Sequence, residues 1–231
     1  MSHASNLTSA QAGVAARAGH LLVVPLGSTE QHGPHLPLTT DADIATAIAK
    51  GLAGVRDDVV VAQVLPFGAS AEHAAFPGTL SIGESALETL LVELGRSASV
   101  TFARVLFVSA HGGNARAVRQ AIARLRAEGR DARAWSPRWR GDAHAGRIET
   151  SLMLHLARDR VRLHLAAAGN VRPLVELMPL MRLGGVAAVS TNGVIGDPTG
   201  ASAAEGAALL DEAIATLSNW VSQWRITVAT G

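Results

Sequence analysis

The chain contains no cysteine among its 231 residues. This absence excludes a disulfide framework, a thiolate metal site and a cysteine nucleophile. The chain also has no excess of one charge, since 20 basic residues oppose 19 acidic ones and the formal net charge is +1. A protein with balanced charges has no strong electrostatic attraction for nucleic acid or for an anionic membrane, so neither is an expected partner. Any metal site must be built from histidine, aspartate and glutamate.

Long apolar runs are lacking as well. No stretch approaches the roughly 20 apolar residues of a membrane span. The N-terminal segment MSHASNLTSAQAGVAARAGH has no basic region followed by an apolar stretch and a cleavage site. We therefore expect a cytoplasmic protein. With 231 residues, 48% of them hydrophobic, the chain can build one substantial core, and we predict a single domain over residues 1–231.

Short apolar, β-branched runs predict the strands of a sheet. They cover residues 21–26, 59–65 and 105–110, with a weaker run at 132–135. The first three are continuous, which is typical of strands covered on both faces. Helical patterns alternate with them, at residues 43–52, 84–97, 114–128, 149–158 and 203–223. This order predicts a layered α/β/α domain with a mostly parallel central sheet, whose ligands gather beyond the carboxyl ends of the strands.

The segment STEQHGPHLPLTTD, residues 28–41, has the composition of a metal site and follows the first predicted strand. Residues two apart in an extended chain project to the same side, so Glu30 and His32 can face one point. A loop that contains two prolines follows His32, and we expect it to bring Asp41 back to the same point. Carboxylate and imidazole together suit zinc, manganese or ferrous iron. The chemistry that this segment predicts is metal-assisted hydrolysis.

A second polar cluster follows the third predicted strand. His111 comes directly after the run at 105–110 and is the fourth candidate ligand. A lone histidine in this place is more often capped or solvated, and it is the convergence of two strand ends that favours a ligand. Gly112 and Gly113 let the backbone approach a ligand closely, and their amides are candidates to stabilise an oxyanion. Asn114 is expected to cap the next helix.

The segment GDAHAGRIETS adds His144 and Glu149. Glu149 falls in the opening turn of a predicted helix, where a carboxylate is favoured whether or not it binds metal. With Glu149 included and Asp41 as the bridge, five ligands suffice for two divalent ions about 3.5–4 Å apart. His144 is then free as an acid and base. We expect it to protonate the departing nitrogen after a metal-bound hydroxide attacks an amide carbonyl.

Other residues of these segments stay outside the predicted ligand set. His35 and Asp43 are expected either to support the metal ligands through hydrogen bonds or to cap a helix, and Asp43 is placed to start the helix at Ile44. Trp135 and Trp139 fit either the wall of a substrate pocket or buried core. The Gly- and Pro-rich stretch at 184–200 predicts a long loop, a rim or a lid over the site.

Four segments, taken in order, resemble the creatininase family of metal-dependent amidohydrolases. They are PLGSTEQHGPHLPLTTD, GASAEHAAFPGTLS, SAHGGN and DAHAGRIETS, and they extend over nearly all of the chain. The resemblance implies a layered α/β fold, a site for two divalent ions (zinc, ferrous iron or manganese) and often a homohexamer. It assigns metal binding to Glu30, His32, the bridging Asp41 and His111, with Glu149 as a further carboxylate and His144 as proton donor or acceptor.

The second of these segments adds Glu72 and His73 as candidates for contact with the substrate or the oxyanion. Two positions depart from the family members that hydrolyse creatinine. Those members carry a carboxylate where Gly113 stands and a tryptophan where Arg140 stands. Both differences disfavour creatinine as the substrate.

Within the family, the stretches GDAHAGRIETSLMLHLARDRVR and GGVAAVSTNGVIGDPTGASAAEG are similar to the mycofactocin-system branch. That branch acts as a peptidase, which implies removal of the modified C-terminal Val-Tyr dipeptide from a precursor peptide. Creatinine amidohydrolase and formamidopyrimidine deformylase, the latter sharing the Gly-Gly-Asn loop, are the alternatives within the family. A metal-binding scaffold that delivers peptide without hydrolysing it is the alternative of another class.

Overall fold

The computed structural model describes residues 2–224. Five strands form one sheet in the order β1-β3-β2-β4-β5, and each neighbouring pair runs parallel. The strands are β1 (Ser2–His3), β2 (Leu21–Leu26), β3 (Val59–Val61), β4 (Arg104–Ser109) and β5 (Asp131–Trp135). The predicted α/β fold with a parallel sheet is confirmed. Residues 1 and 225–231 of the predicted domain lie outside the described residues.

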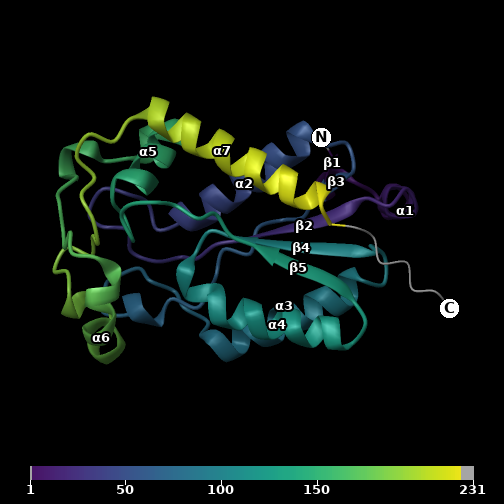
Figure 1. Cartoon of the computed structure of the whole chain (residues 1–231), viewed down its shortest axis with the longest axis horizontal. Coiled ribbons are helices and arrows are strands. Elements are labelled where there is room, and N and C mark those ends of the chain that lie inside the picture. The colour runs from purple at the N-terminus through teal and green to yellow at the C-terminus, as the bar shows by residue number, and fades with distance from the viewer. Residues whose placement is uncertain (1, 225–231) are drawn as a thin grey trace.

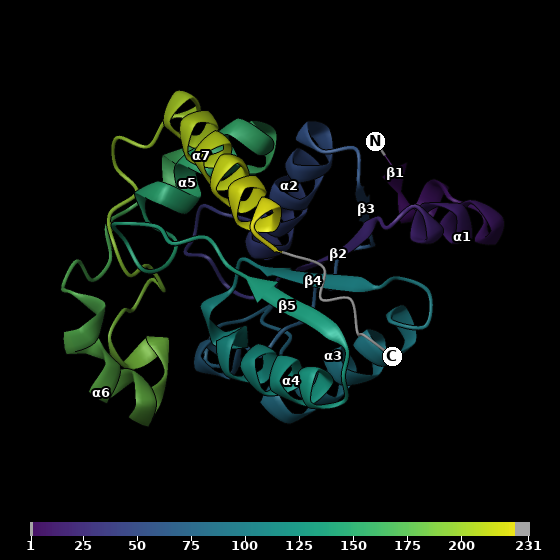
Figure 2. The same ribbon diagram turned by 45° about the vertical axis from the view of Figure 1, so that its right-hand side comes forward.

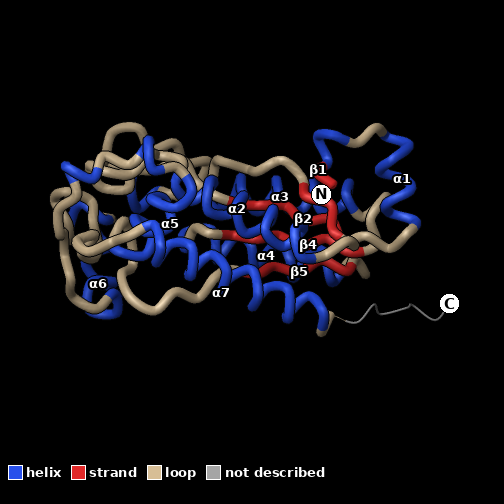
Figure 3. Tube along the Cα trace, turned by 90° about the horizontal axis from the view of Figure 1, so that it is seen from above, coloured by secondary structure: helices blue, strands red, loops and turns tan. Residues whose placement is uncertain are grey.

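Helices cover both faces of this sheet. They are α1 (Ser9–Arg17), α2 (Thr40–Val55), α3 (Glu84–Ala98), α4 (Ala115–Ala127), α5 (Arg147–Leu156), α6 (Leu174–Gly184) and α7 (Ala203–Ser222). Helices α2, α5 and α7 lie on one face, and α3 and α4 lie on the other (Figure 1). Helix α1 and helix α6 lie at opposite ends of the molecule (Figure 3). The result is a three-layer arrangement with the sheet in the middle.

The two cores follow from the alternation of side chains along the strands. Leu21 and Val23 of β2 pack toward α2, α5 and α7, whereas Leu22 and Val24 pack toward α3 and α4. All four side chains are buried. A strand that is covered on both faces needs apolar residues at every position, which is why the sequence of β2 is continuous.

The predicted boundaries shift most at two places, β3 and α2. β3 ends at Val61 rather than at residue 65, although Leu65 still forms an isolated parallel bridge with Leu26. Helix α2 begins at Thr40, so Asp43 lies inside its first turn and does not start it. The Asp43 carboxylate instead accepts hydrogen bonds from Thr39 Oγ1 and from Arg160. The prediction for Asp43 as a helix start is therefore wrong, because the proline-containing loop ends earlier than its composition suggests.

Three elements had no clear sequence signal. Strand β1 has two residues, too few for a periodic pattern. Helix α1 buries none of its residues, and α6 contains Pro179 and buries Leu177 alone among its own residues. Helices without a continuous buried stripe give little amphipathic periodicity. Among residues 2–224, no helix combines the length and the apolar character needed to cross a bilayer.

The stretch at 184–200 is largely irregular after the end of α6, as its composition predicts, and it contains one short helical turn. Gly184 closes α6, a 3-10 turn follows at Val186–Ala188, and Val194 and Ile195 are buried. Ile195 exchanges backbone hydrogen bonds with His144, at 2.9 and 3.2 Å. Part of this loop therefore packs directly beside His144.

The carboxyl ends of the strands face the half of the molecule that carries α5 and α6 (Figure 2). β2 and β4 end side by side, with Leu26 opposite Ser109. The segments that follow these two strands therefore begin next to each other, at the edge of the sheet where α/β folds bind their ligands.

Candidate metal centre

Glu30, Asp41 and His111 meet beyond the ends of β2 and β4. Glu30 follows β2, His111 follows β4, and Asp41 lies in the first turn of α2. Their side chains are buried, with Glu30 fully excluded from solvent. One ligand atom from each lies within 4.8 Å of the others, a spacing that could hold a metal ion. Two segments far apart in the sequence, 28–41 and the one that begins at His111, thus converge at the predicted place.

The two carboxylate oxygens of Asp41 face different imidazoles. Oδ1 lies 3.2 Å from Nε2 of His32, and Oδ2 lies 3.1 Å from Nδ1 of His111. Ser28 holds this orientation, since its hydroxyl donates to Oδ2 at 2.7 Å. A carboxylate placed in this way can bridge two metal ions, whereas a lone imidazole cannot.

His32, His144 and Glu149 form a second group with the same close spacing. His32 Nε2 lies 3.8 Å from Glu149 Oε2. Glu149 stands in the first turn of α5, where its Oε2 also accepts a hydrogen bond from the backbone N–H of Ala145. The structure therefore brings all six residues of the predicted centre together.

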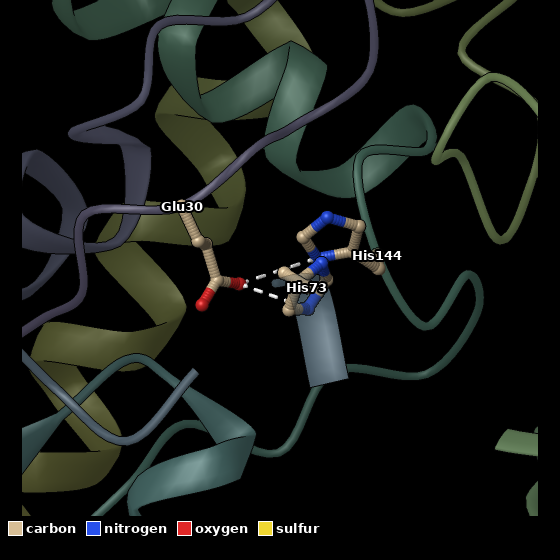
Figure 4. Close-up of side chains that lie close together, drawn as sticks. All are labelled: Glu30, His73 and His144. Atoms are coloured by element: carbon tan, nitrogen blue, oxygen red, sulfur yellow. Dashed lines mark ion pairs between the residues drawn. The ribbon is translucent and has the colours of Figure 1, made fainter. Parts of the chain in front are cut away.

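A third group of possible ligands consists of Glu30, His73 and His144. Figure 4 shows the carboxylate of Glu30 pointing at both rings. Its Oε1 lies 3.3 Å from Nε2 of His73 and 3.7 Å from Nδ1 of His144. His73, a candidate for substrate contact by sequence, is thus next to the carboxylate of a candidate ligand.

The chemistry of Glu30 fits a bound cation. Both of its side-chain oxygens are buried and accept no hydrogen bond within the described residues. Burial, together with the charge of Asp41, raises the pKa of Glu30 to about 7. A buried carboxylate without donors is costly, and a divalent ion removes that cost. Imidazole and carboxylate without thiolate suit zinc, manganese or ferrous iron, so the residues fit the implied metals.

The imidazoles of this cluster differ in charge when no metal is bound. Burial disfavours protonation of His32 and His111, but Asp41 outweighs it and raises the pKa of His32 to about 10 and that of His111 to about 9. Burial and the charge of His32 lower the pKa of His73 to about 3 and that of His144 well below its usual value. Histidines beside Asp41 are therefore cationic, and the other two are neutral.

Gly113 lies against the cluster. A Cβ at this position would lie 2.4 Å from Glu72 Oε1, from His111 Nε2 and from the carbonyl oxygen of Ala69. The carboxylate of Glu72, 3.7 Å from His111 Nε2, takes up this space. No side chain fits at position 113 without displacing these groups. Gly112 is exposed, with open space around its Cα.

Asn114 does not cap α4, contrary to the prediction. Its side chain makes no cap hydrogen bond. Instead Oδ1 accepts from the N–H of Ala69 at 2.9 Å, and Nδ2 donates to the carbonyl of Gly27 at 2.9 Å. The amide is buried and ties together the segments that follow β2 and β3, because their backbone groups need partners more than the exposed helix end does.

His35, Trp135 and Trp139 lie outside the predicted ligand set. His35 is buried with Nε2 2.8 Å from Thr150 Oγ1, and burial lowers its pKa to about 4. Both tryptophans are partly buried and pack against the core, and with Trp220 they line a cavity of about 670 Å³. The lining of this cavity includes none of the candidate ligands, so a role of the tryptophans in a substrate pocket stays a prediction, whereas their contact with the core is confirmed.

Sequence reasoning missed Ser28 and Gln31. Ser28 lies two residues before Glu30, so the alternation that placed Glu30 and His32 on one side could have included it. Gln31 gave no such signal, because alternation places it on the opposite side of an extended chain. It is nevertheless buried and touches two of the clustered histidines.

Comparisons with known proteins place the chain in a family. A family model described as "Creatininase: Creatinine amidohydrolase" matches residues 5–221. A mycofactocin precursor peptide peptidase of Mycolicibacterium smegmatis is 51% identical over 212 residues, covering 89% of this chain and 85% of that protein. A protein of the same name from Mycobacterium tuberculosis is 50% identical over 217 residues, covering 87% and 86%.

Solved structures give the same fold. A crystal structure of creatinine amidohydrolase aligns with a TM-score of 0.83 at 23% identity, covering 96% of each chain. A creatininase structure described with manganese aligns with a TM-score of 0.83 at 22% identity, covering 96% of this chain and 98% of that one. A mutant creatininase described as "Zn-Zn type" aligns with a TM-score of 0.79. By its family match and its relatives, this chain belongs to the creatininase family.

Proposed function

We propose that this protein is a two-metal peptidase that removes the C-terminal Val-Tyr dipeptide from a modified mycofactocin precursor peptide. The main support for the metal centre is the orientation of Asp41, whose two carboxylate oxygens face His32 and His111 at 3.2 and 3.1 Å. The peptide substrate is supported by relatives about 50% identical that are named mycofactocin precursor peptide peptidase. A cytoplasmic location and a homo-oligomer, as large as a hexamer, complete the proposal.

The proposed ligands divide between two positions that share Asp41. Glu30 and His111 would hold one ion, and His32 and Glu149 would hold the other. Two divalent ions bound there would supply an activated water as hydroxide and polarise the carbonyl of the scissile amide. The burial of the ligand side chains keeps the site largely dry, which strengthens every charge interaction inside it.

His144 is the proposed acid and base. Its Nε2 lies 2.8 Å from the backbone carbonyl of Gln31, and its Nδ1 faces Glu30. A carbonyl oxygen only accepts, so Nε2 carries the proton and Nδ1 offers a lone pair to the site. Nδ1 can therefore take up a proton and pass it to the departing nitrogen, which leaves poorly as an anion.

The remaining candidates would contact the substrate. The amides of Gly112 and Gly113 are proposed to stabilise the oxyanion that develops on the carbonyl. Glu72 and His73 line the same side of the site, near His111 and Glu30 respectively. The crowding around Gly113 leaves no room for the carboxylate that creatinine-hydrolysing members carry there, which supports a substrate other than creatinine.

Turnover of the precursor peptide tests this proposal. The protein is loaded with zinc, manganese or ferrous iron and incubated with the modified peptide, and products are identified by mass spectrometry. Release of a Val-Tyr dipeptide by the loaded protein, and none after chelation, is expected. Stoichiometric binding of the peptide without product would instead indicate a delivery scaffold. Turnover of creatinine or of a formamidopyrimidine, with the peptide left intact, would indicate the corresponding family branch.

A further inference from the structure

Gln31 lies between His73 and His144. Its Nε2 lies 2.8 Å from Nδ1 of His73, 3.1 Å from Nε2 of His144 and 3.1 Å from the carbonyl oxygen of Gly193. Its Oε1 lies 2.8 Å from the backbone nitrogen of Gly33. Gln31, His73 and His144 are all buried. Because these side chains are buried, the donor and the acceptor of each hydrogen bond can be assigned from the protein groups alone.

Two backbone groups fix the orientation of the Gln31 amide. The N–H of Gly33 only donates, so the atom that it meets must be the amide oxygen. The carbonyl of Gly193 only accepts, so the atom that it meets must be the amide nitrogen. A flipped amide would lose both hydrogen bonds at once. One N–H of Gln31 remains after the contact with Gly193.

The remaining N–H of Gln31 goes to His73. Nε2 of His144 carries a proton, because it lies 2.8 Å from the backbone carbonyl of Gln31, and it therefore cannot accept a second one. Nδ1 of His73, at 2.8 Å, is the acceptor that is left. A nitrogen that accepts is unprotonated, so the proton of the neutral His73 ring lies on Nε2, which faces Glu30 Oε1 at 3.3 Å.

We propose that Gln31 is a positioning residue that locks His73 as the Nε2–H tautomer, so that the nitrogen of His73 nearest Glu30 is protonated and does not bind metal. The group of Glu30, His73 and His144 is thereby excluded as a metal position, although its spacing would allow one. The two positions that share Asp41 remain. This inference rests on the proposed metal centre, but the tautomer itself does not depend on hydrolysis.

The backbone around Gln31 is shaped for this contact. Gly193 has a φ of +81°, and a Cβ there would lie 2.0 Å from Gln31 Oε1. Gly33 has a φ of +65°. Residues with side chains rarely adopt such conformations, so both glycines allow backbone groups to approach the amide closely. Gln31 and Gly193, which are 162 residues apart in the sequence, thus come into direct contact.

Nitrogen NMR of the histidine rings tests the tautomers directly. Protein labelled with ¹⁵N-histidine is measured at neutral pH after chelation and again after loading with zinc, and His73→Gln and His144→Gln variants assign the two rings. We expect His73 and His144 as Nε2–H tautomers in the metal-free protein, with Nε2 of His73 still protonated in the zinc-loaded protein. An Nδ1–H or doubly protonated His73, or coordination of zinc by His73, would overturn the proposal.

Gln31→Glu replaces the donor of the hydrogen bond to His73 Nδ1 with an acceptor, since a carboxylate accepts and cannot donate. His73 is expected to switch to the Nδ1–H tautomer in this variant, with kcat for the peptide lowered by about 10–100-fold, as for other residues that orient metal-site groups, and KM little changed. Gln120→Glu makes the same change on an exposed face of α4 and is expected to alter neither. An unchanged His73 tautomer in folded Gln31→Glu protein would overturn the proposal.

The wild-type spectrum decides the question even if Gln31→Glu fails to fold. The two hypotheses are also separable. The expected tautomers in a protein that cleaves no peptide would refute the proposed function and leave the role of Gln31 intact. The opposite tautomer in an active peptidase would refute the role of Gln31 alone.

Discussion

Nδ1 of His32 lies 3.1 Å from the backbone carbonyl oxygen of Glu30. Because that oxygen only accepts, Nδ1 donates a proton to it, and Nε2 is the nitrogen that faces Asp41 and Glu149 and that can bind metal once it has lost its own proton. One candidate ligand thus orients another through the main chain. This is the arrangement by which hydrogen bonds behind a metal-binding histidine fix its tautomer and its direction.

Two further rings are held in the same way. Nε2 of His111 lies 3.0 Å from the carbonyl oxygen of Ala69, and Nε2 of His144 lies 2.8 Å from that of Gln31. In each of these rings the other nitrogen, Nδ1, faces a carboxylate of the site. The backbone thus orients three imidazoles before any ion or substrate is present.

Replacing His144 separates proton transfer from metal binding. We expect His144→Ala to keep its metal and to lose about 10²–10⁴-fold in kcat, the usual contribution of a general acid. Metal content and peptide turnover are measured on the same sample. The control is His155→Ala, an exposed histidine at the end of α5, which should change neither. If His144→Ala loses its metal together with its activity, His144 is a ligand and not the acid.

Metal uptake should release protons. His32 and His111, with pKa values of about 10 and about 9 in the metal-free protein, are protonated at neutral pH. Burial is outweighed by the charge of Asp41 at His32, and by the hydrogen bond with Asp41 and the charge of Glu30 at His111. A metal ion binds only the unprotonated ring. The raised pKa values stabilise the metal-free protein at low pH, and this contribution is lost as pH rises through about 9 to 10.

The apparent affinity for zinc should therefore increase with pH up to that range and then level off. Calorimetric titration in two buffers of different ionisation enthalpy gives the number of protons released per ion. A value near zero at neutral pH would show that the two imidazoles are already unprotonated and would contradict this explanation.

Two glycines give opposite expectations for stability. A Cβ on Gly206 of α7 would lie 1.9 Å from the backbone oxygen of Ser151 in α5, so Gly206→Ala must push the two helices apart. We expect the free energy of unfolding to fall by about 1–3 kcal/mol, the usual cost of overpacking. A Cβ on Gly54 in α2 meets nothing within 4 Å, and Gly54→Ala should add about 0.5–1 kcal/mol.

Thermal unfolding of both variants checks this pair, since 1 kcal/mol corresponds to about 2–4 °C in a protein of this size. An unchanged melting temperature for Gly206→Ala would mean that α5 and α7 separate at no cost. Because α5 carries Glu149, the same variant should also bind metal more weakly.

Much of the fold could be predicted from the sequence because the main strands are buried on both faces. Continuous apolar runs such as Leu21–Leu26 have few alternatives to a central parallel strand. Strand β1 and helices α1 and α6 lack such a signal, since they are short or bury few side chains. Their positions are set by tertiary contacts that no local pattern encodes.

The convergence of Glu30, His32, Asp41 and His111 could also be predicted, because parallel strands bring their carboxyl ends to one edge. The role of Gln31 could not. An amide has no distinctive chemistry, and its contacts with Gly33, His73 and Gly193 exist only after three distant segments have met. The prediction that Asn114 caps a helix was wrong for the same reason. Its side chain instead forms hydrogen bonds with buried backbone groups of Gly27 and Ala69, which are distant in the sequence.

Metal content of the purified active protein tests the central claim most directly, with Asp41→Ala beside the wild type and Asp43→Ala as the control from the same helix turn. Asp43 contacts Thr39 and Arg160 and lies outside the three candidate metal groups. We expect two divalent ions per chain in the wild type and in Asp43→Ala, and loss of at least one ion in Asp41→Ala. Wild-type protein that cleaves the peptide without metal, or Asp41→Ala protein that retains two ions, would contradict the bridged centre.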